Sequence, residues 1–281
     1  MDVAGTDVRP SGEIADQEIT EIDVARVALT CRVLGKLGLT HEPAGHVSMR
    51  IGDRIIIKGR GRGESGLAYS GPDDMLVVDL RGRQVMGRAD LSVPLEVHIH
   101  TALYREYPDI SSVVHVHPEE AVLLSVCDLP LLPIFGAYDP LALRVAEDGI
   151  ALYDRSILVS DEVIGSEFAA AMAGRPACVM RGHGITTTGS SPEEASLNAV
   201  KLAELAQMNY RARLVGTPRP LPHDEREHFA GGDPSRWPDH VRSAWRYYCA
   251  KVGEAASSED VWAVTPLKVD RPPPDPDAHP S

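Results

Sequence analysis

The sequence has few cysteines, no long apolar run, and fewer basic than acidic residues. Its four cysteines are far apart and form no Cys-x-x-Cys pair, which argues against a disulfide framework or a cysteine-based zinc site. No apolar run approaches the length of a membrane span, and the N-terminus is acidic where a signal peptide would be basic and then apolar. The sequence therefore predicts a cytoplasmic location and no membrane partner.

Charge limits the partners further. Lys and Arg total 28 against 41 Asp and Glu, which gives a formal net charge of -13. Nucleic acids and anionic membranes are disfavoured as partners because both carry dense negative charge. An anionic substrate would need a local basic pocket. The chain of 281 residues is long enough for one α/β unit with tails.

Hydrophobic patterning divides the chain into three segments. Residues 1–16 and the Pro-rich residues 257–281 can bury too little apolar surface to offset ordering entropy, so both are predicted to be disordered around one folded domain at 17–256. Helices are predicted at 17–39, 119–127, 161–173 with Ser160 as N-cap, 191–214 and 240–252, and from Pro94 onward. Strands are predicted at 54–58, 75–79, 113–116, 156–159 and 177–180.

One glutamate and four histidines carry the main chemical signal. His115 and His117 are two residues apart, so they share one face of a strand and can reach one ion. His183 lies between two glycines after a second strand-like run and supplies a third imidazole. Glu96 and His100 share a face of their predicted helix. This pattern indicates a three-histidine metal site with an open position for water or substrate.

The other histidines are interpreted separately. His100 either orients Glu96, or is a fourth imidazole near the metal, or is a helix-face side chain bonded to a backbone carbonyl. The remaining ones lack ligand spacing and are predicted to be solvated or structural, with His98 off the face of Glu96: His41, His98, His223, His228, His240 and His279.

Four motifs in this order resemble the class II aldolase/adducin superfamily over roughly residues 20–250. They are Gly45-His46-Val47-Ser48-Met49-Arg50, Glu96-x-x-x-His100, Tyr104-Arg-Glu-Tyr-Pro-Asp109 leading into His115-Val-His117-Pro118, and Arg181-Gly-His183-Gly. The resemblance implies a three-layer α/β/α fold around a mostly antiparallel sheet. It also implies a homotetramer with active sites at subunit interfaces.

The resemblance also implies residue roles. In that family three histidines bind a divalent metal, and the matching positions are His115, His117 and His183. The family's acid/base carboxylate, which can also ligate the metal when substrate is absent, falls on Glu96. One divalent ion per chain is therefore expected, as Zn, Mn or Fe(II).

The sugar-phosphate aldolases of the family resemble one another in binding phosphate through Gly-Asn, Thr-Gly and Ser-Ser pairs. Here the corresponding positions are Gly45-His46, a rebuilt segment at 59–71, and Pro94-Leu95 before the glutamate. Because a buried phosphate needs several such donors, a phosphorylated sugar is a poor substrate candidate.

Side chains near the former phosphate region suit a carboxylated small molecule instead. The predicted substrate-binding residues are His46, Ser48, Arg50 and Lys58. Arg60 and Arg62 either pair with a carboxylate or are ordinary solvated loop charges. Residues 132–135 supply an apolar wall, and Tyr138 nearby supplies an aromatic hydroxyl and is predicted to be catalytic.

The segment around Tyr138 and Arg181-Gly-His183-Gly look most like the family's aromatic-acid decarboxylase branch and an aminocoumarin-pathway relative, a non-haem iron oxygenase. The first hypothesis is a metal-dependent lyase that decarboxylates a hydroxylated aromatic or aryl-pyruvate acid, with the metal as electron sink and Glu96 as acid/base. The alternative is an Fe(II) oxygenase that shortens a prenylated 4-hydroxyphenylpyruvate in antibiotic biosynthesis. A sugar-phosphate aldolase and a non-enzymatic adducin-like binding module are less favoured.

Overall fold

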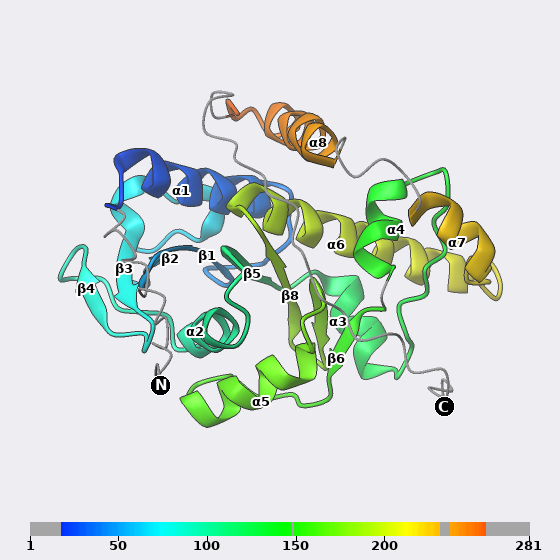
Figure 1. The fold of residues 1–281 in the computed structure, drawn as a ribbon, viewed down its shortest axis with the longest axis horizontal. Helices are drawn as coiled ribbons and strands as arrows, with labels where there is room; N and C mark the ends of the chain where they lie inside the picture. The colour runs from blue at the N-terminus through cyan, green and yellow to red at the C-terminus, as the bar shows by residue number, and fades with distance from the viewer. Residues whose placement is uncertain (1–17, 148, 231–236, 257–281) are drawn as a thin grey trace, which may run out of the picture.

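A computed structural model describes residues 18–147, 149–230 and 237–256. The two predicted disordered segments, and His279 with them, lie outside the described residues. Figure 1 shows one mixed sheet with α1, α6 and α8 on one face and α2 and α5 on the other. The expected three-layer α/β/α architecture is therefore confirmed. No helix among the described residues is long and apolar enough to cross a membrane.

The sheet has eight strands in the order β4-β3-β2-β1-β5-β8-β7-β6. All neighbouring strands are antiparallel except the β6/β7 pair, so the expectation of a mostly antiparallel sheet is confirmed. The strand bounds are β1 His46–Ile51, β2 Arg54–Lys58, β3 Met75–Asp79, β4 Gln84–Met86, β5 Ser112–Val116, β6 Ala151–Tyr153, β7 Ala177–Met180 and β8 Gly184–Gly189.

The helices fall close to their predicted places, except that α4 and α7 were not predicted. Their bounds are α1 Glu21–Lys36, α2 Val97–Glu106, α3 Glu119–Val126, α4 Pro140–Ala146, α5 Glu162–Met172, α6 Pro192–Val215, α7 His223–Ala230 and α8 Trp237–Lys251. Two short 3₁₀ helices, Leu67–Tyr69 and Pro72–Asp74, follow the Gly-rich loop. Helix α6 begins with Ser191 capping the N–H of Glu194 and ends at Gly216, as its sequence predicts.

Three local predictions were wrong. The run 156–159 is a loop, and the parallel edge strand is the nearby β6. The backbone of the loop does not pair with the sheet at Val159, because the Val159 N–H donates to Glu96 Oε1 over 3.0 Å. Helix α5 is capped by Asp161 rather than Ser160, because the Asp161 carboxylate accepts from the first-turn N–H groups of Val163 and Ile164. Helix α2 starts at Val97 and not at Pro94, which leaves Glu96 at the N-cap.

Strand alternation decides which side chains share the functional face. Val47 and Met49 of β1 pack into the core against α1 and α6. His46 and Ser48 therefore point to the opposite face, which α2 covers. In β5, Val113 packs into the α2 core, and His115 shares its face.

Candidate metal centre

The metal centre lies at the middle of the sheet, where β1, β5 and β8 are neighbours. His46 pairs with His115 across β1 and β5, and His115 pairs with Thr186 across β5 and β8. His117 follows β5 directly, and His183 lies in the turn between β7 and β8. Residues from distant parts of the sequence thus meet at one point of the sheet.

Three imidazoles converge there. His115, His117 and His183 each offer a ligand atom, and these atoms all lie within 4.8 Å of one another. The Nε2 atoms of His115 and His117 are 2.9 Å apart. Two nitrogens that both bind one ion at roughly 2.0–2.1 Å lie about this far apart when the angle between the two bonds is about 90°. The donor set and its spacing therefore fit a divalent cation.

Neighbouring groups fix how His115 is presented. Its Nδ1 lies 3.1 Å from Thr186 Oγ1, and the Thr186 hydroxyl donates to the Met180 sulfur at 3.4 Å. With the Thr186 proton on the sulfur, His115 donates from Nδ1, and the lone pair on its Nε2 is free for a cation. A partner on the remote nitrogen is the usual way in which proteins orient a metal-binding imidazole.

Two glycines allow the histidines to approach each other. Gly182 has a φ of 60°, in the region that favours glycine, at the turn before His183. A Cβ on Gly184 would lie 2.5 Å from Cδ2 of His117 and 2.5 Å from the Val116 carbonyl oxygen. Any larger residue at position 184 would displace His117.

Glu96 supplies the anionic group of the centre. Its Oε2 lies 3.4 Å from His183 Nε2 and 3.7 Å from His115 Nε2, while Oε1 accepts the Val159 N–H. Burial alone would raise the pKa of Glu96, but the hydrogen bond with His183 and the one from Val159 outweigh burial and lower it. The carboxylate is therefore ionised and available as a base.

Burial keeps His115 and His117 uncharged. Burial, together with the neighbouring imidazoles, lowers the pKa of His115 well below its ordinary value. Burial and the nearby His183 lower the pKa of His117 to about 4. Neutral imidazoles are the form that binds metal.

A second set of buried polar groups adjoins the metal centre. His100 Nε2 lies 2.6 Å from His46 Nδ1, and His100 Nδ1 lies 2.6 Å from Ser48 Oγ. Ser48 Oγ is in turn 2.7 Å from the Tyr104 hydroxyl. The ring of His100 is thus bonded to His46 and Ser48, and not to Glu96 or a backbone carbonyl. We call Tyr104, Ser48, His100 and His46 the donor chain.

The predicted cationic residues lie in different places. Arg50 donates to the backbone oxygens of Gly52 and Tyr104, at 2.8 and 2.7 Å, and so braces β1 against α2. The side chain of Lys58 is 3% exposed. It points to the face of β2 that α1 covers, where its positive charge acts on the pKa of Cys31. His115 lies on the opposite face of the sheet.

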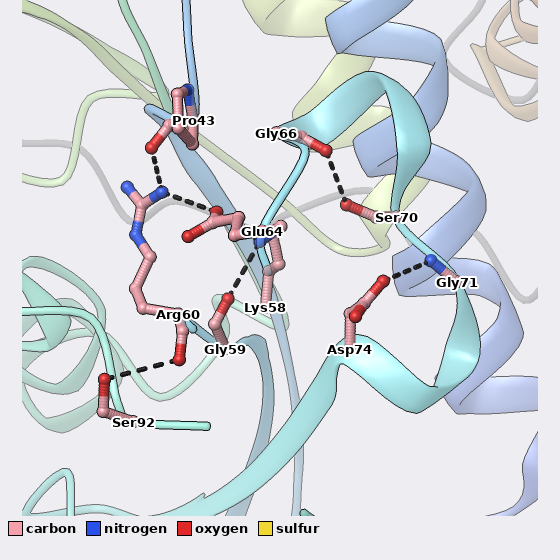
Figure 2. A network of polar contacts seen from close by, with 10 residues as sticks. All are labelled: Pro43, Lys58, Gly59, Arg60, Glu64, Gly66, Ser70, Gly71, Asp74 and Ser92. Carbon is pink, nitrogen blue, oxygen red and sulfur yellow. Dashed lines mark hydrogen bonds and ion pairs between the residues drawn. The ribbon is translucent and has the colours of Figure 1, made fainter. Parts of the chain in front are cut away.

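Figure 2 shows how the Gly-rich loop neutralises its cations. Glu64 Oε1 accepts from Lys58 Nζ at 2.5 Å and from Arg60 Nη1 at 2.7 Å. Arg60 also donates to the Pro43 carbonyl oxygen, and its charge contributes to lowering the pKa of both His46 and His117. Arg60 therefore acts on the metal centre through its charge. Glu64 was not among the residues predicted from the sequence, although it lies six residues after Lys58 in a Gly-rich loop.

The same loop borders a cleft of about 270 Å³. Charged side chains of both signs line it: Lys58, Arg62, Glu64, Asp74, Arg88 and Asp90. Arg62 therefore faces this cleft, while Arg60 is bound to Pro43 and Glu64.

Tyr138 and the apolar segment lie away from the centre. Tyr138 is 78% exposed, and its ring lies tilted against that of Phe135, with centroids 5.3 Å apart, just before α4. Phe135 packs with Ala142 and Leu205 of α4 and α6. Within the described parts of the chain, no hydrogen bond or ring contact joins Tyr138 to the metal centre. Its catalytic role stays a prediction.

Comparison with known proteins agrees with this geometry. The profile of the Class II Aldolase and Adducin N-terminal domain family matches residues 25–210, which include every residue of the metal centre. The chain belongs to this family.

Class II aldolase relatives match most of the chain. A 3,4-dihydroxyphthalate decarboxylase of Arthrobacter keyseri is 34% identical over 239 residues, which are 82% of this chain and 93% of that protein. A protein of the same name from Terrabacter sp. (strain DBF63) is 36% identical over 232 residues, 81% of this chain and 95% of its own. The structure of L-fuculose 1-phosphate aldolase from Glaciozyma antarctica PI12 has a TM-score of 0.71 at 16% identity, covering 87% of this chain and 95% of that one, which supports the fold alone.

Proposed function

We propose that this protein is a metal-dependent lyase that decarboxylates a hydroxylated aromatic acid, with 3,4-dihydroxyphthalate as the leading candidate. The observation that carries the proposal is the convergence of three imidazoles and the ionised Glu96 at one point of the sheet. Relatives named as 3,4-dihydroxyphthalate decarboxylases, similar over four fifths of this chain, support the substrate class.

His115, His117 and His183 would hold the cation. When bound, a divalent cation supplies Lewis-acid stabilisation for negative charge on a substrate oxygen. Thr186 orients the ring of His115, and the close approach at Gly184 positions that of His117. Metal identity, and the homotetramer expected from the family, stay predictions.

Glu96 would move the proton. In the ionised form it takes the proton of a substrate hydroxyl. The bond between the ring carbon and the carboxyl carbon then breaks, carbon dioxide leaves, and the electron pair stays on the ring. Protonated Glu96 returns its proton to that ring carbon, and the product leaves as a phenolate. The carboxylate is thus a base in the first step and an acid in the last.

Arg60 would hold a second carboxylate of the substrate. The guanidinium already binds a carboxylate, that of Glu64, at 2.7 Å and is 26% exposed. A planar guanidinium matches carboxylate geometry, which suits an aromatic dicarboxylate better than a phosphorylated sugar. Buried Lys58 holds Glu64 in place from the other face of the sheet.

The proposal is tested with purified protein loaded with Zn, Mn or Fe(II), under air and under nitrogen. We expect carbon dioxide release from 3,4-dihydroxyphthalate under both atmospheres and no turnover of fuculose 1-phosphate. Oxygen consumption coupled to shortening of an aryl-pyruvate would favour the oxygenase alternative. Efficient cleavage of a sugar phosphate would overturn the proposed substrate class.

A further inference from the structure

We propose that Tyr104, Ser48 and His100 hold His46 as an uncharged Nε2–H hydrogen-bond donor aimed at the metal centre. The inference rests on the proposed function for its chemical use, because it assigns to His46 the stabilisation of a substrate oxyanion. It assigns to Tyr104, Ser48 and His100 the role of positioning residues, which act through His46 without touching substrate.

The donor chain is enclosed by protein. His100 and Ser48 are fully buried, Tyr104 is 1% exposed and His46 is 2% exposed. Consecutive members are 2.6, 2.6 and 2.7 Å apart, so each link is a short hydrogen bond. Buried polar groups at these distances polarise one another and hold one arrangement, because an unpaired member would be costly.

The direction of the hydrogen bonds follows from the proton count at Tyr104. Burial raises the pKa of the Tyr104 phenol, so its proton stays on the oxygen. Among the hydrogen bonds of the described residues, Ser48 Oγ is the one acceptor for the phenolic proton. Tyr104 therefore donates to Ser48. The Ser48 hydroxyl must then donate its own proton to Nδ1 of His100.

The same count continues to His46. A neutral His100 that accepts at Nδ1 carries its proton on Nε2, and that N–H donates to Nδ1 of His46. Burial lowers the pKa of His100 to about 3, so a second proton on this ring is excluded near neutral pH. A neutral His46 that accepts at Nδ1 carries its own proton on Nε2. The opposite direction would leave the Tyr104 proton without an acceptor.

His46 Nε2 is the ring nitrogen left for the metal centre. The ring of His46 stacks on His115 with centroids 5.1 Å apart and planes inclined by 30°. His46, Glu96 and His115 each bring a polar atom within 4.8 Å of the others. A protonated nitrogen cannot ligate a cation, so the donor chain keeps His46 out of the ligand set.

An uncharged imidazole N–H suits the chemistry of decarboxylation. Negative charge develops on a substrate oxygen when the carbon–carbon bond breaks, and a fixed donor in a dry site stabilises that charge without reorganising. A neutral imidazole used as the electrophile, with a strongly lowered pKa, has precedent in triosephosphate isomerase. Proton transfer along the whole chain is disfavoured, because it would leave a buried tyrosinate.

The direct test is the tautomer of His46 in zinc-loaded protein labelled with ¹⁵N-histidine. Nitrogen chemical shifts distinguish Nδ1–H from Nε2–H, and a His46→Gln sample assigns the resonances. We expect His46 and His100 both protonated at Nε2, with no zinc-shifted resonance from His46. An Nδ1–H tautomer at His46, or coordination of His46 to zinc, would overturn the inference.

Kinetics supply a second readout. Tyr104→Phe removes the hydroxyl and keeps the ring. The direction of the hydrogen bonds along the donor chain is then no longer fixed. We expect a mixture of His46 tautomers, a fall in kcat of roughly 10-fold and a KM within about 2-fold of the wild-type value. Removal of the oxyanion donor itself typically lowers kcat by roughly 100-fold or more. Metal content should stay unchanged. Tyr153→Phe is the matched control, a buried tyrosine in the same apolar layer but outside the donor chain.

Unchanged kcat and an unchanged tautomer in Tyr104→Phe would reject the positioning role. The tautomer measurement needs no turnover. A protein that is inert toward the aromatic acid therefore contradicts the proposed function, whereas an Nδ1–H His46 in an active decarboxylase contradicts only the present inference.

Discussion

The metal centre and the Gly-rich loop at 59–66 are neighbouring polar regions built on opposite principles. At the centre, three imidazoles and one carboxylate bring their possible ligand atoms close together. In the loop, the charges of Lys58 and Arg60 are already balanced by Glu64. The first arrangement would be stabilised by a bound cation, whereas the charges of the second are already balanced within the chain. We therefore expect mutations at the centre to act on metal and chemistry, and mutations in the loop to act on substrate affinity.

The largest effect should follow removal of a metal ligand. His183→Ala takes away one of three converging imidazoles, so we expect metal content to fall below about one tenth of an ion per chain and kcat to drop by about 1,000-fold or more. Elemental analysis and a decarboxylation assay measure both. His98→Ala is the matched control, because His98 packs against α5 at Gly165. An active, metal-free His183→Ala protein would refute the assignment.

Glu96→Gln should separate chemistry from metal binding. The three histidines remain, so most of the metal should stay bound, while loss of the proton carrier should lower kcat by about 100-fold or more. Metal content and turnover are measured on the same sample. An active variant would remove Glu96 from the proton-transfer role, and an inactive metal-free one would make it a principal ligand.

Arg60→Gln tests the loop side of the comparison. Loss of one charge-assisted carboxylate contact should raise KM for an aromatic ortho-dicarboxylate by about 10-fold, because such a contact contributes about 1.5–3 kcal/mol. The KM of a hydroxylated monocarboxylate should change little, and kcat should be retained. Arg62→Gln serves as the control from the adjoining cleft. Equal effects of Arg60→Gln on both substrates would contradict the second-carboxylate role.

Substitution of Glu254, a carboxylate outside both regions, should have the smallest effect. Arg32 and Lys36 of α1 bond Glu254 at 2.9 and 2.7 Å, and Arg32 contributes most to lowering the pKa of Glu254. Because the folded pKa is below the ordinary value of 4.5, this stabilisation is complete above that pH and is lost as pH falls through the folded pKa. Glu254→Gln should lower the free energy of unfolding by roughly 0.5–1 kcal/mol at pH 7.

Urea unfolding of wild type and Glu254→Gln at several pH values measures that difference. The difference in the free energy of unfolding between the two proteins should become smaller as the solution is acidified below about pH 4.5. A gap that widens on acidification would contradict the direction of the pKa shift.

The convergence of the three histidines could be predicted from the sequence because their spacing is local. His115 and His117 share a strand face in any register, and glycines on both sides of His183 indicate a close backbone approach. The strands rich in Ile and Val were equally readable. β8 was missed because its sequence, Gly-Ile-Thr-Thr-Thr-Gly, carries β-branched threonines without an apolar run.

The partners of these residues could not be read from the sequence, because they depend on contacts between distant segments. His100 and Ser48 are 52 positions apart, and their bond depends on how α2 packs across β1. Lys58 was placed near substrate from its position in the chain, yet alternation in β2 turns it to the α1 face. The exposure of Tyr138 likewise depends on the packing of its segment against α4 and α6.

The central claim is that a cation held by three histidines is required for decarboxylation without oxygen. The most direct measurement is carbon dioxide release from 3,4-dihydroxyphthalate under nitrogen, as metal is titrated into chelator-treated protein. We predict that release is negligible at first, rises in proportion to added metal and levels off at about one ion per chain. Full activity in metal-free protein, or a strict need for oxygen at every metal level, would contradict the claim.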